Sequence, residues 1–179
     1  YPASYCGRHY DGNIVTEAIG WKQQGRIDEE EFRHIEDIAE PCPGSCAMLG
    51  TANTMSALSE SLGMSLMGSS TIPAVLAARM AKGVETGEKI VELVQKGVTT
   101  RDILTEDAFE NAVMLLLTMG GSTNGILHLQ AIYHEAGLGE LPLSVFDEFS
   151  RRIPQVASIY PASEFDMVAF YEGGGVPAV

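Results

Sequence analysis

The chain has 179 residues, of which 24 are acidic and 11 basic, so its formal net charge is −13 at neutral pH. This acidic balance argues against binding of nucleic acid through a basic face. Hydrophobic residues make up 45% of the chain and charged residues 20%, far from the composition of disordered proteins. We therefore expect residues 1–179 to fold as a single domain segment with one core.

The apolar runs, the cysteine count and the chain ends indicate the cellular compartment and the extent of the protein. The longest apolar run, Ala112 to Met119, is about half as long as a membrane span, which predicts no membrane helix. Three cysteines are too few and odd in number for a disulfide framework, which favours a reducing compartment, the cytoplasm. The first residues lack an initiator Met and a secretory signal, and the last ones form a Gly-rich loop, so we expect a piece of a longer protein.

Helical spacing dominates the first third of the chain. Asp28 followed by Glu31 resembles a capping box, and the helix that it begins must stop near Pro41. A second helix is predicted over residues 51–62, where Gly63 supplies a C-terminal stop.

Two helices are predicted in the middle of the chain. The first begins at the Ile72-Pro73 step and ends by Gly83. The second covers residues 88–96, is capped by Gly97, and is expected to turn three apolar side chains inward, those of Ile90, Leu93 and Val94.

The strongest helix signal lies over residues 106–119. Thr105 is its expected N-cap, and the run from Ala112 is apolar nearly all round, so this helix should be buried. Helical spacing resumes over residues 126–136 after a Gly-rich turn. Residues 156–160, between two prolines, form the one plausible strand.

The segment Cys42-Pro43-Gly44-Ser45-Cys46 forms a turn that leads into a helix. Thiolates near a helix N-terminus have a lowered pKa and are good ligands for soft metals and iron–sulfur clusters. Buried, inert thiols are also common, and the spacing alone leaves both interpretations open.

The segment Gly120-Gly121-Ser122-Thr123-Asn124-Gly125 joins two predicted helices. Its glycines and the free N–H groups of the following helix start predict an anion cradle for a carboxylate or phosphate. An ordinary Gly C-cap followed by a Ser/Thr/Asn N-cap accounts equally well for the pattern. No Lys follows the glycines, which excludes a Walker A loop.

The isolated titratable residues carry little signal. His128 and His134 are six residues apart and lie on different faces of one helix, so a shared metal site is not expected. Asp11 could bind a metal, but a turn-capping role is favoured.

Several motifs together resemble one family. They occur in order along almost the whole chain, and the family is that of the dihydroxy-acid dehydratases and phosphogluconate dehydratases. The matching strings are Pro43-Gly44-Ser45-Cys46, Gly50-Thr51-Ala52-Asn53-Thr54-Met55, Leu62-Gly63-Met64-Ser65-Leu66, Asp102 to Asn111, Gly121-Ser122-Thr123-Asn124 with Leu127-His128-Leu129, and the terminal Gly-Gly-Val-Pro-Ala-Val.

The resemblance implies a hydro-lyase that converts 2,3-dihydroxy carboxylates to 2-keto acids with an iron–sulfur cluster, of 2Fe–2S type, and Mg²⁺. By this resemblance Cys46 corresponds to the third cysteine ligand of the cluster, and Cys42 is a neighbouring cysteine. Ser122, Thr123 and Asn124 match a turn near the active site, and we infer a contact with the substrate carboxylate there. His128 is expected to support that turn.

The resemblance also implies an α/β fold, in which this chain is the helix-rich part of a three-layer α/β/α domain. The parent enzyme would be a homodimer or homotetramer. The family's other cysteine ligand motif, its acidic metal ligands and its proposed serine base are not found here. A lone cysteine cannot hold a cluster, so residues 1–179 alone are expected to be metal-free and inactive, and the parent to be the enzyme.

The sequence therefore leaves three functional hypotheses. The first is a dihydroxy-acid dehydratase of branched-chain amino-acid biosynthesis, and the second a sugar-acid dehydratase acting on an aldonate or phosphogluconate. The third, from another class, is a non-catalytic acidic module that binds anions at the Gly-rich turn.

Overall fold

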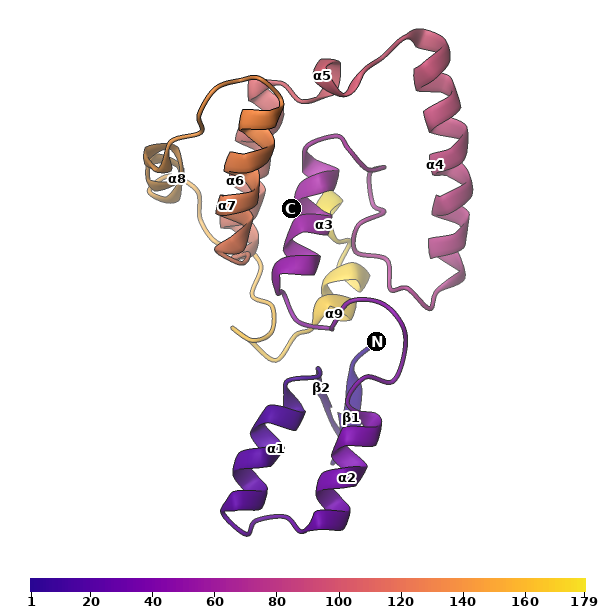
Figure 1. Cartoon of the computed structure of the whole chain (residues 1–179), viewed down its shortest axis with the longest axis vertical. Helices are drawn as coiled ribbons and strands as arrows, with labels where there is room; N and C mark the ends of the chain where they lie inside the picture. Colours follow the sequence, from indigo (N-terminus) through magenta and orange to yellow (C-terminus); the bar gives the residue numbers. More distant parts are fainter.

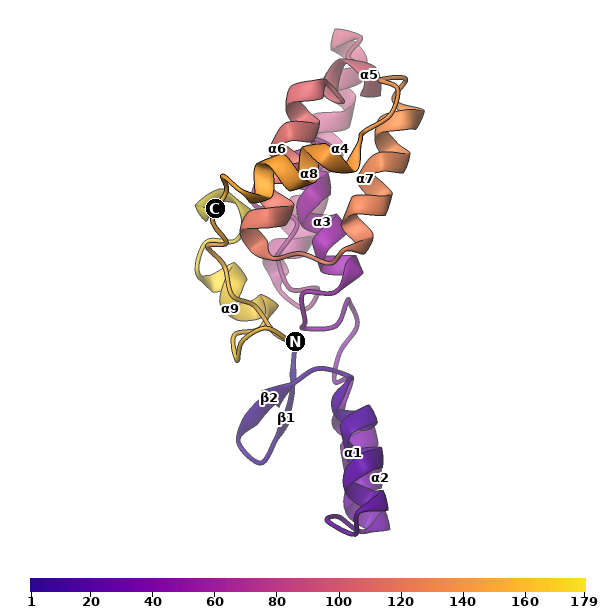
Figure 2. The same cartoon turned by 90° about the vertical axis from the view of Figure 1, so that its left-hand side faces the viewer.

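The computed structural model describes all residues from 1 to 179 and consists of two helical parts (Figure 1 and Figure 2). The smaller part contains a two-stranded hairpin and the helices α1 and α2. The larger part contains helices α3 to α9. The two parts meet at the end of the larger part where α3 begins and α9 lies (Figure 1).

The smaller part is built around its own core. Strands β1 (Ala3–Tyr5) and β2 (Arg8–Tyr10) pair in antiparallel register. The two turn residues between them both have positive φ, the conformation of a tight hairpin. Helices α1 (Ile14–Gln23) and α2 (Glu29–Ile38) pack side by side, and their contact buries Ile14, Ala18, Ile35 and Ala39.

The predicted start of α2 is confirmed, but only half of the capping box forms. The Asp28 carboxylate accepts a hydrogen bond from the Glu31 N–H at 2.8 Å. The Glu31 carboxylate instead accepts a hydrogen bond from the hydroxyl of Tyr5, which ties α2 to the hairpin. This hydrogen bond to a carboxylate raises the pKa of the Tyr5 phenol.

The larger part packs around α6 (Glu106–Met119), as the apolar run predicted. Thr105 caps the helix by accepting a hydrogen bond from the Ala108 N–H. Helices α3 (Thr51–Ser61), α7 (Asn124–Glu135) and α8 (Leu143–Ser150) pack against it. The core residues on α6 are Phe109, Ala112, Val113, Leu115, Leu116 and Met119.

The prediction of two separate helices in the middle of the chain is wrong. A single helix, α4 (Ala77–Lys96), runs through Gly83 and Gly87 before the short α5 (Thr100–Ile103). A helical glycine costs only about 1 kcal/mol and neither position is followed by proline, so the helix continues. None of its residues is buried, and Ile90 and Val94 point outward with 55% and 71% of their surface exposed.

The predicted strand over residues 156–160 is also wrong. No neighbouring strand is present to pair with it, and its backbone is held by isolated contacts instead. The N–H groups of Val156 and Ala157 both donate to the carbonyl of Thr118 at the end of α6. The chain then forms α9 (Met167–Glu172) and a final 3₁₀ turn, Val176–Ala178.

The fold is therefore helix-rich with one small antiparallel sheet, which is compatible with an α/β domain. The predicted three-layer arrangement stays a prediction, because the only sheet here has two strands. None of the helices combines the length and apolar composition that a membrane span requires.

Two glycines allow α6, α7 and α3 to approach closely. A Cβ on Gly121 would lie 2.7 Å from Leu116 Cδ1, and one on Gly125 would lie 3.0 to 3.2 Å from Leu116, Thr54 and Leu58. These contacts are tighter than a packed core tolerates without movement.

We expect Gly125→Ala to lower the free energy of unfolding by about 1 kcal/mol or more, because the added methyl overpacks the contact with α3. The matched control is Gly87→Ala, also within a helix but with no atom within 4 Å of the added Cβ. That change should raise stability by about 0.5–1 kcal/mol. Urea unfolding of both variants is the measurement, and equal effects would contradict the packing described.

The ion pairs on the exposed helix α4 can be tested by pH titration. Hydrogen bonds and ion pairs with Lys89 and Lys96 lower the pKa of Glu92 to about 2. Because the folded-state pKa is depressed, the contribution of these pairs is present above the ordinary Glu pKa and is lost as the pH falls toward 2. Carboxyl NMR titration should show this depression, and K89Q/K96Q should abolish it. An ordinary Glu92 pKa in the unmodified chain would contradict these ion pairs.

Candidate functional site

The first helical turn of α3 contacts both of the loop segments that the sequence singled out. We call residues 43–46 the cysteine turn and residues 121–124 the GSTN turn. Residues from Thr51 to Thr54 contact both of them. Segments more than 60 positions apart in the chain are thus attached to one helix end.

The side chain of Asn53 holds the cysteine turn. Its Nδ2 donates to the backbone carbonyls of Cys46 and Met48, each at 2.7 Å. Its Oδ1 accepts a hydrogen bond from the Ser45 hydroxyl at 2.9 Å. Asn53 is buried, so these three hydrogen bonds satisfy a polar group that would otherwise be costly to enclose.

The stretch after Cys46 is fixed from its other side by the C-terminal segment. The Ala47 carbonyl accepts a hydrogen bond from Met167 N–H, and the Leu49 N–H donates to the Tyr160 carbonyl, both at 2.8 Å. With Asn53 on one side and these residues on the other, the backbone that positions Cys46 has little freedom.

Two threonines of α3 hold the GSTN turn. The buried Thr54 hydroxyl accepts a hydrogen bond from the Ser122 N–H at 3.0 Å. The Asn124 side chain donates to the Thr51 hydroxyl at 2.7 Å. Within the turn, the Ser122 hydroxyl accepts from the Asn124 N–H and its carbonyl from the Gly125 N–H. Most of the N–H groups expected to cradle an anion therefore already have acceptors.

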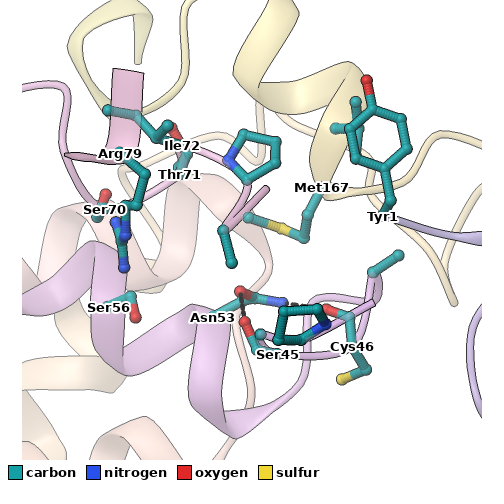
Figure 3. A pocket seen from close by; sticks show the side chains of 16 residues that line it. Tyr1, Ser45, Cys46, Asn53, Ser56, Ser70, Thr71, Ile72, Arg79 and Met167 are labelled. Atoms are coloured by element: carbon teal, nitrogen blue, oxygen red, sulfur yellow. Dashed lines mark hydrogen bonds between the residues drawn. The ribbon is translucent and has the colours of Figure 1, made fainter. Parts of the chain in front are cut away.

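The environment of Cys46 differs from the expectation of a lowered pKa. Burial, followed by the nearby negative charges of Asp11 and Glu40, raises the pKa of the Cys46 thiol, although the Met48 N–H acts in the opposite direction. Cys46 precedes the first residue of α3 by several positions, and the effect of the helix end falls off within a turn. Cys46, Asn53 and Arg79 are among the residues that line a pocket of about 90 Å³. In Figure 3 the Cys46 Sγ lies at the edge of this pocket and points away from Arg79.

The donor atoms present do not make a complete cluster or metal site. No set of three or more His, Cys, Asp or Glu side chains lies close enough to hold a metal ion. Cys46 is half-buried on a well-held turn, which suits a single thiolate ligand. A cluster requires several, so the assignment of Cys46 stays a prediction about the longer protein.

The other candidate residues lie apart from this arrangement or serve local structure. Cys6 is exposed in the hairpin turn, and Cys42 is half-buried. Asp11 is buried and accepts the Asn13 N–H at 3.0 Å, the turn-capping role that the sequence favoured. His128 is exposed and makes no hydrogen bond to the GSTN turn, so its expected supporting role is taken by Thr51 and Thr54.

Of the substrate-binding candidates, Ser122 is half-buried and Thr123 and Asn124 are exposed at the start of α7. Their contact with a substrate stays a prediction. No role is predicted from the sequence for Asn53, Thr51 or Thr54, although all three lie within the Thr51–Met55 string of the family resemblance. The signal available in the sequence was the presence of Asn53 and Thr54, two polar residues, near the start of a helix that follows a cysteine.

We expect Asn53→Ala to lower the free energy of unfolding by about 1–3 kcal/mol, because two backbone carbonyls lose their donor. Asn53→Asp should be at least as disruptive, since a carboxylate would face the carbonyls of Cys46 and Met48. Ser45→Ala is the milder control, as it removes only the hydrogen bond to Oδ1. Denaturant unfolding ranks the three variants, and a harmless Asn53→Ala would contradict the role of Asn53.

Known proteins resemble this chain over almost its whole length. The profile of the family described as dihydroxy-acid/6-phosphogluconate dehydratase, N-terminal, matches residues 3–179. The dihydroxy-acid dehydratase of Metallosphaera sedula is 45% identical over 178 residues, which are 99% of this chain and 32% of that protein. That of Ignicoccus hospitalis is 50% identical over 157 residues, 88% of this chain and 28% of that protein. The chain spans about a third of the length of such relatives, and it belongs to the dihydroxy-acid/6-phosphogluconate dehydratase family.

Proposed function

We propose that the protein to which this chain belongs is a hydro-lyase that dehydrates a 2,3-dihydroxy carboxylic acid to a 2-keto acid. The observation that carries the proposal is the joint attachment of the cysteine turn and the GSTN turn to the start of α3. The names of the relatives favour a dihydroxy-acid dehydratase, and we propose that it serves branched-chain amino-acid biosynthesis. A sugar-acid dehydratase acting on an aldonate or phosphogluconate is the alternative within the family.

The reaction sets clear demands on the site. The C2 proton leaves to a base, the C3 hydroxyl departs and takes up a proton as water, and the resulting enol tautomerises to the 2-keto acid. Because the C2 proton is weakly acidic, the negative charge that develops next to the carboxylate must be stabilised. The carboxylate itself must be held so that C2 and C3 are correctly placed.

The residues of this chain fit two parts of that task. Cys46 would be one thiolate ligand of an iron–sulfur cluster, of 2Fe–2S type, and the complete protein would also hold Mg²⁺. Ser122, Thr123 and Asn124 would contact the substrate through their side chains and through the Thr123 N–H, which has no acceptor within the protein. The remaining ligands and the base would come from the rest of the complete protein, the part that corresponds to the regions of the relatives that this chain does not cover.

We propose a cytoplasmic homodimer or homotetramer that acts on a small-molecule acid, in which these helices form one portion of a three-layer α/β/α domain. A non-catalytic anion-binding module is less well supported, because the N–H groups of Ser122, Asn124 and Gly125 are engaged within the protein.

The activity is tested with the complete protein purified without oxygen. It should convert 2,3-dihydroxy-3-methylbutanoate to the corresponding 2-keto acid, measured as a hydrazone, faster than it converts gluconate or phosphogluconate. The reverse preference would support the sugar-acid alternative. Absence of keto-acid formation from all of these acids, in protein with its metal content restored, would contradict the proposed function.

The role of Cys46 is tested separately. Cys46→Ser in the complete protein should lose most of its iron and its thiolate-to-iron absorption, since a cluster depends on each of its thiolates. Cys6→Ser, an exposed cysteine in the hairpin, is the matched control and should keep both. Unchanged iron content in Cys46→Ser would exclude this residue as a ligand.

The GSTN turn is tested by kinetics. Ser122→Ala and Thr123→Val should raise KM about tenfold, the effect of one lost hydrogen bond to a charged group, and leave the cluster absorption intact. Thr99→Val, at a distant capping box, is the control. An unaltered KM in both turn variants would place the substrate elsewhere.

A further inference from the structure

A second polar pocket lies between α3, the loop after it and the first turns of α4. Its volume is about 310 Å³, and none of its nine lining residues is hydrophobic or acidic. Two of them, Arg79 and Lys82, are cationic, and the others are hydroxyl residues and a glycine. In a chain with a net charge of −13, a pocket with only cationic and hydroxyl side chains stands out from the acidic surface.

The guanidinium group of Arg79 is largely free to bind a ligand. Its single hydrogen bond runs from Nη1 to the Ser69 carbonyl at 2.6 Å, and it forms no salt bridge. Lys82 forms an ion pair with Glu85 at 2.6 Å that is partly exposed to solvent. The positive charge of the pocket therefore rests mainly on Arg79, and Lys82 adds to it in part.

Four of the six hydroxyl groups that line the pocket are unpaired, whereas Ser59 donates to the Met55 carbonyl and Thr86 to the Lys82 carbonyl. Ser70 Oγ is buried and has no hydrogen-bond partner in the protein. The hydroxyls of Ser56, Ser65 and Ser69 make no hydrogen bonds, although they line the same pocket. A buried hydroxyl without a partner costs free energy, and an acceptor bound in the pocket would remove that cost.

The nearest buried carboxylate does not occupy this pocket. Glu60 uses both of its oxygens to accept backbone N–H groups, from Gly68 and, at 2.9 Å, from Ser70. It lines a different pocket, together with Met67 and residues of α6. Its hydrogen bonds fix the loop that carries Ser69 and Ser70.

The polar pocket adjoins the region of the cysteine turn. Ser56, Ser70 and Arg79 also line a smaller pocket, of about 90 Å³, together with Cys46 and Asn53. Figure 3 shows Arg79, Ser70 and Ser56 grouped on one side of that pocket, with Cys46 on the opposite side.

We propose that Arg79, Lys82 and the surrounding serines form a binding site for a small phosphate-class oxyanion. A guanidinium fork with several hydroxyl donors matches an acceptor with three or more oxygens better than a carboxylate, which offers two. The site does not depend on the proposed dehydratase activity. The anion is either free phosphate or the phosphate group of a phosphorylated small molecule.

The test is equilibrium dialysis of the complete protein with radiolabelled inorganic phosphate. Arg79→Gln should weaken binding at least tenfold, Lys82→Gln a few-fold, and Ser70→Ala should weaken it without loss of the fold. Arg101→Gln, an exposed arginine of α5 without a salt bridge, is the matched control and should bind like the unmodified protein. Arg79→Lys, which keeps the charge, should retain part of the affinity.

Competition separates the sources of the anion. If phosphogluconate displaces labelled phosphate at a lower concentration than unlabelled phosphate does, the ligand is a phosphorylated small molecule. If phosphogluconate displaces it less well than unlabelled phosphate does, the ligand is free phosphate. Failure of the unmodified protein to bind phosphate, or equal losses in Arg79→Gln and Arg101→Gln, would overturn the proposal. Because binding is measured without turnover, neither result depends on whether the dehydratase assay succeeds.

Discussion

The hydrogen bonds of Asn53 are the constraint on which the candidate site depends. One amide side chain joins α3 to the carbonyls on both sides of Ala47 and to the Ser45 hydroxyl. The next residue of the helix, Thr54, holds the GSTN turn. Adjacent positions on one buried helix thus fix two segments that come from distant parts of the chain, and neither turn could move far without breaking contacts with α3.

Much of the helical structure was predictable from the sequence because its signals are local. The caps at Asp28 and Thr105 and the apolar run of α6 depend on neighbours within a few residues, and all were confirmed. The continuous helix α4 was missed because glycine was given the weight of a stop signal, although it only reduces helix propensity. Residues 156–160 have the composition of a strand but no partner strand.

The candidate site was predictable in its parts and not in its assembly. The Cys46 and Ser122 segments were identified from their residue types, but the role of Asn53 depends on carbonyls that only the tertiary fold places within reach. The thiol of Cys46 was expected to ionise easily, whereas burial and the charges of Asp11 and Glu40 act against this. Burial and the charge of Asp11 depend on the tertiary fold, and local sequence patterns around Cys46 do not contain them.

The most direct test of the role of α3 is a crystal structure of the complete protein, grown without oxygen, with data collected at the iron absorption edge. We predict an anomalous peak for iron next to Cys46 Sγ and the same three hydrogen bonds with Asn53. An iron peak remote from Cys46, or a cysteine turn held by residues other than Asn53, would contradict the central role given to the start of α3.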